Sequence, residues 1–109
     1  MTYQEIAEMI ASINRPYAYD HFTEDTAKAP PFICFYYDGD DDFIADNTNY
    51  KKIRPLTIEL YTDNKDFVSE ALVEATLNAN GLVYTRSETY ISTEKMYMVT
   101  FQTEVIING

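Results

Sequence analysis

A run of acidic residues at 38–42 is the sequence feature most suggestive of metal chemistry. Carboxylates at alternate positions bind Ca²⁺ in EF-hand loops, which also need glycine at the sixth position and glutamate at the twelfth. Counted from Asp38, those positions hold Phe43 and Asn49, and the pattern predicts no flanking helices. We therefore interpret the run as a solvated hairpin turn rather than a metal site. Its carboxylates are Asp38, Asp40, Asp41 and Asp42.

The single histidine and the single cysteine are the other residues that could do chemistry. His21 follows Asp20, but neighbouring side chains in a strand point to opposite faces, so we predict a partly buried histidine rather than a general base. Cys34 lies among aromatic residues, where burial raises the pKa of a thiol and makes it unreactive. A Cys34–His21 dyad requires the two side chains to meet in the fold, and no family signature surrounds the cysteine.

Cofactor and nucleic-acid sites are not indicated by the composition. Three glycines leave no phosphate-binding loop, and no serine lies in a nucleophile-elbow pattern. The chain has 8 Lys and Arg against 18 Asp and Glu, a net charge of −10, whereas nucleic acids are bound by basic surfaces. The basic cluster Lys51, Lys52 and Arg54 balances the acidic run beside it. We predict no enzymatic activity, no metal or cofactor, and no specific binding of nucleic acid or membranes.

Two segments have the pattern of helices. Thr2 and Glu5 match a capping box, and residues 3–13 carry apolar side chains at helical spacing until Pro16 ends the helix. Residues 62–64 supply N-caps for a second helix, which ends at Gly81 in a left-handed turn. The predicted buried face of this second helix consists of Phe67, Val68, Ala71, Leu72, Ala75 and Ala79.

Most of the remaining chain has the pattern of strands. The clearest is 56–61, where apolar and polar residues alternate with the period of a half-buried strand. An almost continuous apolar run at 32–37 predicts a strand covered on both faces. A returning hairpin strand is expected within 43–52, with a second turn at 46–49. The predicted strands are 17–22, 32–37, one within 43–52, 56–61, 82–90 and 95–107.

The predicted order of elements is therefore α-β-β-β-β-α-β-β in a single domain, 1–109. Long strands that are adjacent in sequence indicate a mainly antiparallel sheet with two helices packed on it, an α+β fold. We expect synthesis in the cytoplasm, because no signal-peptide pattern or membrane-length apolar run is found. The predicted core includes Ile58, Leu60, Leu72, Val99 and Phe101.

Ten tyrosines and six phenylalanines give the chain a high aromatic content. In a sheet protein such residues fill the core and the strand surfaces. Tyrosine is also enriched at protein interfaces, because its ring is apolar and its tip is polar. Tyr36, Tyr61 and Tyr90 are the interface candidates, since the opposite faces of their strands carry more core-like residues. The pattern alone leaves both interpretations open.

Four segments carry a resemblance to a known family. They are Pro-Tyr-Ala-Tyr-Asp-His-Phe at 16–22 after the first helix, Pro-Pro-Phe-Ile-Cys-Phe-Tyr at 30–36 with Phe-Ile-Ala-Asp at 43–46, Ile-Glu-Leu-Tyr-Thr-Asp-Asn-Lys-Asp at 58–66, and Glu-Lys-Met-Tyr-Met-Val-Thr-Phe at 94–101. Read in this order along the whole chain, the pattern resembles the tail-completion, or tail-terminator-like, proteins encoded among the head-to-tail genes of long-tailed phages and prophages.

The resemblance implies a curved, mostly antiparallel sheet flanked by helices, and no catalytic residue. Proteins of this kind assemble as rings, typically hexamers, which cap the finished tail tube and face the head connector. The chain would then act in tail completion or head–tail joining. Its partners would be further copies of itself, the tail tube protein and the head-connector protein. It would be present in the host cytoplasm during assembly and afterwards in the virion.

We expect the segment 32–52 to form the subunit or partner contact, because its tip is acidic and its stem is aromatic. The basic cluster offers the opposite charge to the acidic tip of a neighbouring copy. A small acidic adaptor or regulatory protein-binding module is the alternative function, and a major tail protein gene next door would favour the assembly role instead. The candidate interface residues are Tyr36, Asp38, Asp40, Asp41, Asp42, Lys51, Lys52 and Arg54.

Overall fold

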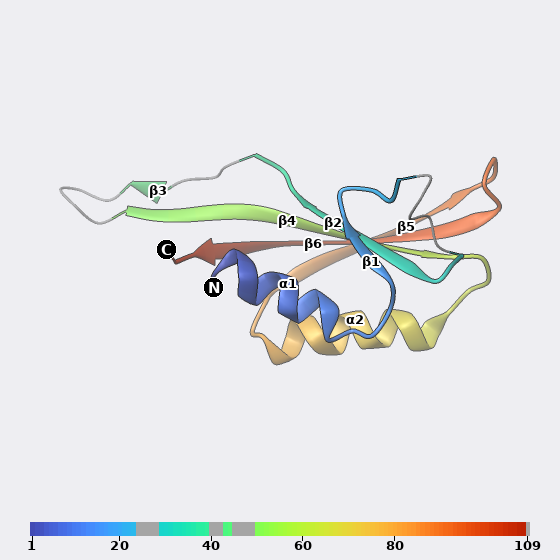
Figure 1. Cartoon of the computed structure of the whole chain (residues 1–109), viewed down its shortest axis with the longest axis horizontal. Coiled ribbons are helices and arrows are strands. Elements are labelled where there is room, and N and C mark those ends of the chain that lie inside the picture. Colours follow the sequence, from blue (N-terminus) through green and yellow to red (C-terminus); the bar gives the residue numbers. More distant parts are fainter. Residues whose placement is uncertain (24–28, 40–42, 45–49, 109) are drawn as a thin grey trace.

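The computed structural model describes residues 1–23, 29–39, 43–44 and 50–108. Two helices lie on the same side of a mixed sheet (Figure 1). The order of the elements confirms the predicted α-β-β-β-β-α-β-β arrangement and the α+β class. The elements are α1 (Tyr3–Ala11), β1 (Tyr17–Tyr19), β2 (Phe32–Tyr37), β3 (Phe43–Ile44), β4 (Tyr50–Thr62), α2 (Phe67–Ala79), β5 (Tyr84–Ile91) and β6 (Met96–Ile107).

The strands follow the spatial order β1-β2-β4-β6-β5, and β3 pairs separately with the start of β4. β1 and β2 run parallel, and the other described pairs are antiparallel, as predicted for most of the sheet. The long central pair, β4 and β6, places Ile58 opposite Phe101. Both side chains are fully buried, so the centre of the sheet is also the centre of the core.

The strand that returns alongside β2 is β4, and this corrects the expected return at Phe43. Tyr37 pairs with Leu56 in β4, whereas Phe43 pairs with Lys51 at the far end of the same strand. The reason is the length of β4, which has 13 residues against six in β2. Its first part extends past the helices with β3 alongside it (Figure 1). Residues 40–42 of the turn expected at 38–42, and the second turn expected at 46–49, lie outside the described residues.

Helix α1 matches its sequence pattern closely. The backbone N–H of Glu5 donates to the Thr2 hydroxyl at 3.1 Å, and the Glu5 carboxylate accepts the Thr2 N–H at 2.8 Å, which completes the predicted capping box. Tyr3 is 39% exposed and packs edge-on against Tyr37 instead of entering the core. The side chains that α1 and its exit bury are Ile6, Met9, Ile10 and Ile13.

The two ends of α2 are held by local hydrogen bonds. Asp66 is the N-cap and its carboxylate accepts the Ser69 N–H at 2.9 Å, so the cap lies beyond the predicted segment 62–64. At the other end Gly81 has a φ of 71°, as predicted, and the Leu82 N–H donates to the Leu77 carbonyl at 3.0 Å. This bond belongs to a Schellman motif, in which a left-handed residue lets the chain turn back over the helix end.

Helix α2 buries the face opposite to the predicted one. Phe67 and Val68 are 70% and 68% exposed, and Leu72, a predicted core residue, is 37% exposed. Glu70 points inward, where Lys65 and Arg86 bind its carboxylate. The apolar residues named above lie on the opposite, outward side of the helix. The side chains that face the sheet are Ser69, Glu70, Val73 and Leu77.

The core lies between the two helices and the central strands. Of the five predicted core residues, four are confirmed as buried: Ile58, Leu60, Val99 and Phe101. β1 ends at Tyr19, earlier than the predicted Phe22, because Asp20 adopts a left-handed φ of 67° that breaks the extended strand. Among the described residues, neither helix combines the length and apolar character that a membrane span requires.

Candidate interaction surfaces

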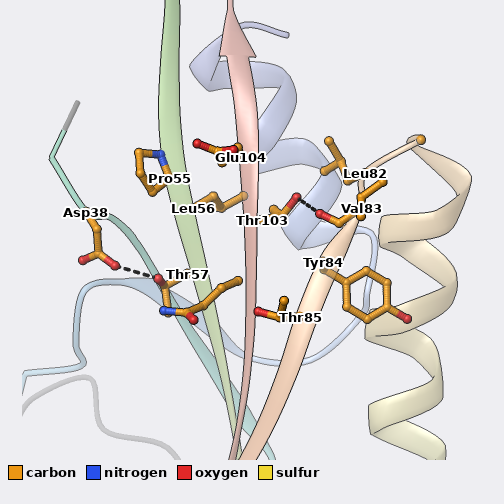
Figure 2. Close-up of a pocket in the computed structure, with 12 residues that line it drawn as sticks. Asp38, Pro55, Leu56, Thr57, Leu82, Val83, Tyr84, Thr85, Thr103 and Glu104 are labelled. Atoms are coloured by element: carbon orange, nitrogen blue, oxygen red, sulfur yellow. Dashed lines mark hydrogen bonds between the residues drawn. The ribbon is translucent and has the colours of Figure 1, made fainter. Parts of the chain in front are cut away.

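Asp38, the first residue of the acidic run, is fixed to β4. Figure 2 shows the Thr57 hydroxyl donating to the Asp38 carboxylate, at 2.9 Å, and the Asp38 N–H donates to the Pro55 carbonyl at 3.0 Å. Gly39 then turns the chain with a φ of 63°, a conformation that glycine adopts without strain. Asp40, Asp41 and Asp42 lie outside the described residues. Among those described, no three His, Cys, Asp or Glu side chains are placed to hold a metal ion.

Arg54 connects the start of the acidic run to helix α1. Its Nε donates to the Gly39 carbonyl at 3.1 Å, and its Nη1 donates to the Tyr3 hydroxyl at 3.0 Å. The guanidinium also lies over the Tyr37 ring, 4.9 Å from its centroid, in a cation–π contact. The structure thus brings a member of the predicted basic cluster to the acidic run, through a backbone carbonyl. Lys52, which precedes Arg54 in β4, is half-buried, and Lys51 pairs with β3.

Tyr36 is held within its own subunit by Glu59. The hydroxyls of Tyr36 and Tyr61 donate to the two oxygens of this carboxylate, at 3.0 and 2.8 Å. Burial, and then the Glu59 hydrogen bond, raise the pKa of Tyr36 to about 12. Phe32 stacks on Tyr61 with ring centroids 4.9 Å apart. These side chains form a half-buried aromatic cluster on the sheet face opposite the helices. Tyr90, at 51% exposure, is the more accessible of the three tyrosine candidates.

The histidine and cysteine do not form a nucleophilic pair. Cys34 is buried, and burial raises the pKa of its thiol to about 11, with the charges of Glu59 and Asp20 adding to the rise. It is therefore protonated at neutral pH, as predicted. His21 is exposed rather than partly buried, and its Nδ1 lies 2.8 Å from the Asp20 carboxylate. The prediction that these two neighbours point apart was wrong, because the left-handed backbone of Asp20 ends the alternation of the strand.

Two hollows of the described surface adjoin the candidate residues. The larger, about 640 Å³, runs from Asp38 and Pro55 across β6 to Val83 and Thr85 (Figure 2). At its far side the Thr103 hydroxyl donates to the Val83 carbonyl at 2.6 Å. The smaller, about 330 Å³, lies beside the buried thiol and the exposed histidine. The residues that line it are Asp20, His21, Phe22, Phe32, Cys34, Tyr61, Ile91, Glu94 and Met96.

The outward face of α2 is the surface that the sequence pattern misplaced. On the side of α2 that faces the sheet, Glu70 is 3% exposed, and its carboxylate contacts Lys65 at 2.5 Å and also Arg86. These two cations in turn contact Glu88. The charges of the helix are thereby directed inward, and apolar side chains face outward. The signal was present in the apolar spacing of residues 67–79, but it was assigned to the core.

No protein-family model and no curated protein sequence matches the chain. Among solved structures, its fold is similar to that of a chain described as part of the virion of a native gene transfer agent (GTA) particle. The superposition covers 98% of this chain and 91% of that chain, with a TM-score of 0.57 and 15% sequence identity. At this identity the likeness is one of fold, and it extends over nearly the whole of both chains.

Proposed function

We propose that this chain is a non-enzymatic structural component of a phage-like virion. The observation that carries the proposal is the shared fold, over 98% of this chain, with a protein that is itself part of a virion particle. We propose further that the chain acts in tail completion or head–tail joining, as a ring at the end of the tail tube. Its partners are then further copies of itself, the tail tube protein and the head-connector protein.

The chemistry of the candidate residues supports a structural role. The Cys34 thiol is buried and protonated, so it is a poor nucleophile. The polar groups of Tyr36, Asp38 and Arg54 are engaged in hydrogen bonds that fix the strands to one another and to α1. Side chains that are engaged in this way stabilise the fold, which is the role expected of them in a structural protein.

The shape of the chain supports assembly through projecting segments. Its principal extents are 51 × 28 × 23 Å, and β4 runs past the helices with β3 beside it (Figure 1). A ring needs heterologous contacts, in which one surface of a subunit meets a different surface of its neighbour. We propose that the acidic run at 38–42 of one copy contacts the basic cluster Lys51, Lys52 and Arg54 of the next, beside Tyr36.

Complementation in the parent phage tests both levels of the proposal. Deleting the gene is expected to abolish infectious particles, and intact infectious long-tailed particles after deletion would refute the structural role. Changing the three aspartates at 40–42 to Asn is expected to lower the yield of joined, terminated tails. The matched control removes the same three charges elsewhere, by Glu8→Gln, Asp63→Asn and Glu94→Gln, all at exposed positions. Equal yields from both triple variants would refute the acidic contact and leave the structural role standing.

A further inference from the structure

The outward face of α2 is an apolar stripe that is exposed in the part of the protomer that the structure describes. Its residues recur at intervals of three and four, so they lie along one line of the helix. Val68 is 68% exposed and Leu72 37%, and the alanines beside them are exposed as well. We call this surface the α2 stripe, and its members are Val68, Ala71, Leu72, Ala75 and Ala79.

The α2 stripe carries no charge, on a chain whose net charge is −10. The carboxylates of the helix lie on its other side: Glu70 is bound by Lys65 and Arg86, and Glu74 accepts the Tyr84 hydroxyl at 2.9 Å. Two copies of so acidic a protein repel one another, and the repulsion is least where the approaching surfaces have no carboxylates. The stripe is such a surface.

A second surface, whose own residues are uncharged, lies behind α2 on the opposite face of the sheet. Glu59, whose carboxylate is bound by Tyr36 and Tyr61, adjoins it at Thr100, and Glu104 lies at its edge. Arg86 and Glu88 of β5 point toward α2. Arg86 binds Glu70 there, and Glu88 binds Lys65. Because side chains alternate along a strand, the residues between them point the other way, and the register places their β6 neighbours on that same side. We call this surface the β5–β6 face, and its members are Thr85, Ser87, Thr89, Met98, Thr100 and Gln102.

We propose that the α2 stripe of one copy docks on the β5–β6 face of the next copy. A helix laid on a sheet is a standard packing of layers in proteins. The two surfaces lie on opposite sides of one protomer. Each copy can therefore contact one neighbour through its α2 stripe and another through its β5–β6 face. Such a heterologous contact builds rings and filaments. This inference rests on the proposed assembly of several copies, and it adds a contact distinct from the acidic run.

The size of the stripe indicates where the contact forms. A 13-residue helix is about 20 Å long and about 10 Å wide, so its outward face offers roughly 200 Å². A stable interface between free proteins buries about 800 Å² per partner. The stripe alone therefore does not hold free copies together, and the contact forms in the particle, where further contacts add to it.

Cross-linking in purified particles tests the arrangement. The variant carrying both Val68→Cys and Ser87→Cys is expected to give a ladder of dimers, trimers and higher species with a short bismaleimide, and its longest rung counts the subunits of the ring. Either substitution alone is expected to give no cross-link between copies, and the unaltered chain serves as the control because Cys34 is buried. A dimer from Val68→Cys alone, or its cross-link to a different virion protein, would overturn the proposal.

A charge placed on the stripe provides an independent measurement. Val68→Asp is expected to lower incorporation into particles about a hundredfold, the loss that an uncompensated carboxylate produces at a contact. The fold should tolerate it, because an acidic residue in the first turn of a helix interacts favourably with the helix dipole. Gln4→Asp, which adds the same charge in the first turn of α1 at an exposed position away from both surfaces, is the matched control. If the unaltered chain is absent from particles, the proposed function fails. If it is present but the ladder is missing or both variants incorporate equally, this inference alone fails.

Discussion

Two valines of α2 provide a direct test of which face of the helix is buried. Val73 is fully buried against the sheet, whereas Val68, five residues earlier, is 68% exposed. The substitution Val→Ala removes the same two methyl groups at both positions, from the same helix and without altering charge. The apolar pattern of the sequence predicts the larger loss at Val68, and the structure predicts it at Val73. The pair of variants therefore separates the two assignments.

The magnitude follows from burial. Each buried methyl contributes about 0.8 kcal/mol, so Val73→Ala loses about 1.6 kcal/mol of transfer free energy. The cavity left behind raises the total to about 2–3 kcal/mol, because the surroundings relax only in part. Val68→Ala loses almost no burial, and alanine is the better helix former by roughly 0.5 kcal/mol. We expect its free energy of unfolding to be unchanged or slightly higher.

Equilibrium urea unfolding followed by far-ultraviolet circular dichroism measures both variants against the unaltered chain. Equal denaturant slopes would show that only the folded-state stability has changed. Leu77→Ala and Leu72→Ala repeat the comparison with a larger side chain, since Leu77 is fully buried and Leu72 is 37% exposed. A greater loss at Val68 than at Val73 would show that the facing of α2 described here is wrong.

Three further outcomes are expected. Phe101→Ala should lower the free energy of unfolding by about 3–5 kcal/mol, because Phe101 is fully buried and packs on Tyr84; a loss below about 1 kcal/mol would place it outside the core. Asp66→Ala should cost about 0.5–2 kcal/mol as a lost N-cap, whereas Asp66→Asn should keep the cap. Hydrogen bonds from Ser69 lower the pKa of Asp66, so the part of its contribution that depends on the charge is present above the unfolded-state pKa and lost as pH falls through the folded-state pKa. A difference between the unaltered chain and Asp66→Ala that does not change with pH would contradict this. The melting temperature should not respond to EDTA or to millimolar Ca²⁺, and a rise with Ca²⁺ would overturn the interpretation of residues 38–42 as a turn.

The elements that sequence reasoning placed well are those whose signals are local. The capping box at Thr2 and Glu5, the alternation around Ile58 and the left-handed turn at Gly81 each depend on a few neighbouring residues. They therefore appear in the structure as the pattern indicates. The facing of the last strand was also predicted, because Val99 and Phe101 alternate with polar residues along most of its length.

What the sequence could not supply were contacts between distant residues. Arg54 binds the Tyr3 hydroxyl across 51 positions, and Arg86 reaches Glu70 across 16. Neither pair leaves a periodic trace, so the basic cluster was interpreted as simple charge balance, and the burial of Glu70 was not predicted. The meeting of Asp20 and His21 was missed for a different reason, because one left-handed residue ends the alternation on which the prediction depended.

The arrangement of α2 connects the stability of the protomer with the contact that we propose for its outward face. Covering an exposed valine, leucine or phenylalanine side chain contributes about 1.5–3 kcal/mol, and the isolated protomer leaves Phe67 and Val68 largely uncovered. It instead buries Glu70, whose desolvation is offset by Lys65 and Arg86. A helix rotated to bury its apolar face would gain that apolar burial but would expose the ion pairs and separate Glu70 from its partners. The burial of Val73 and Leu77, together with the network of Lys65, Glu70 and Arg86, thus fixes the rotation of α2 and leaves its outward apolar side chains exposed.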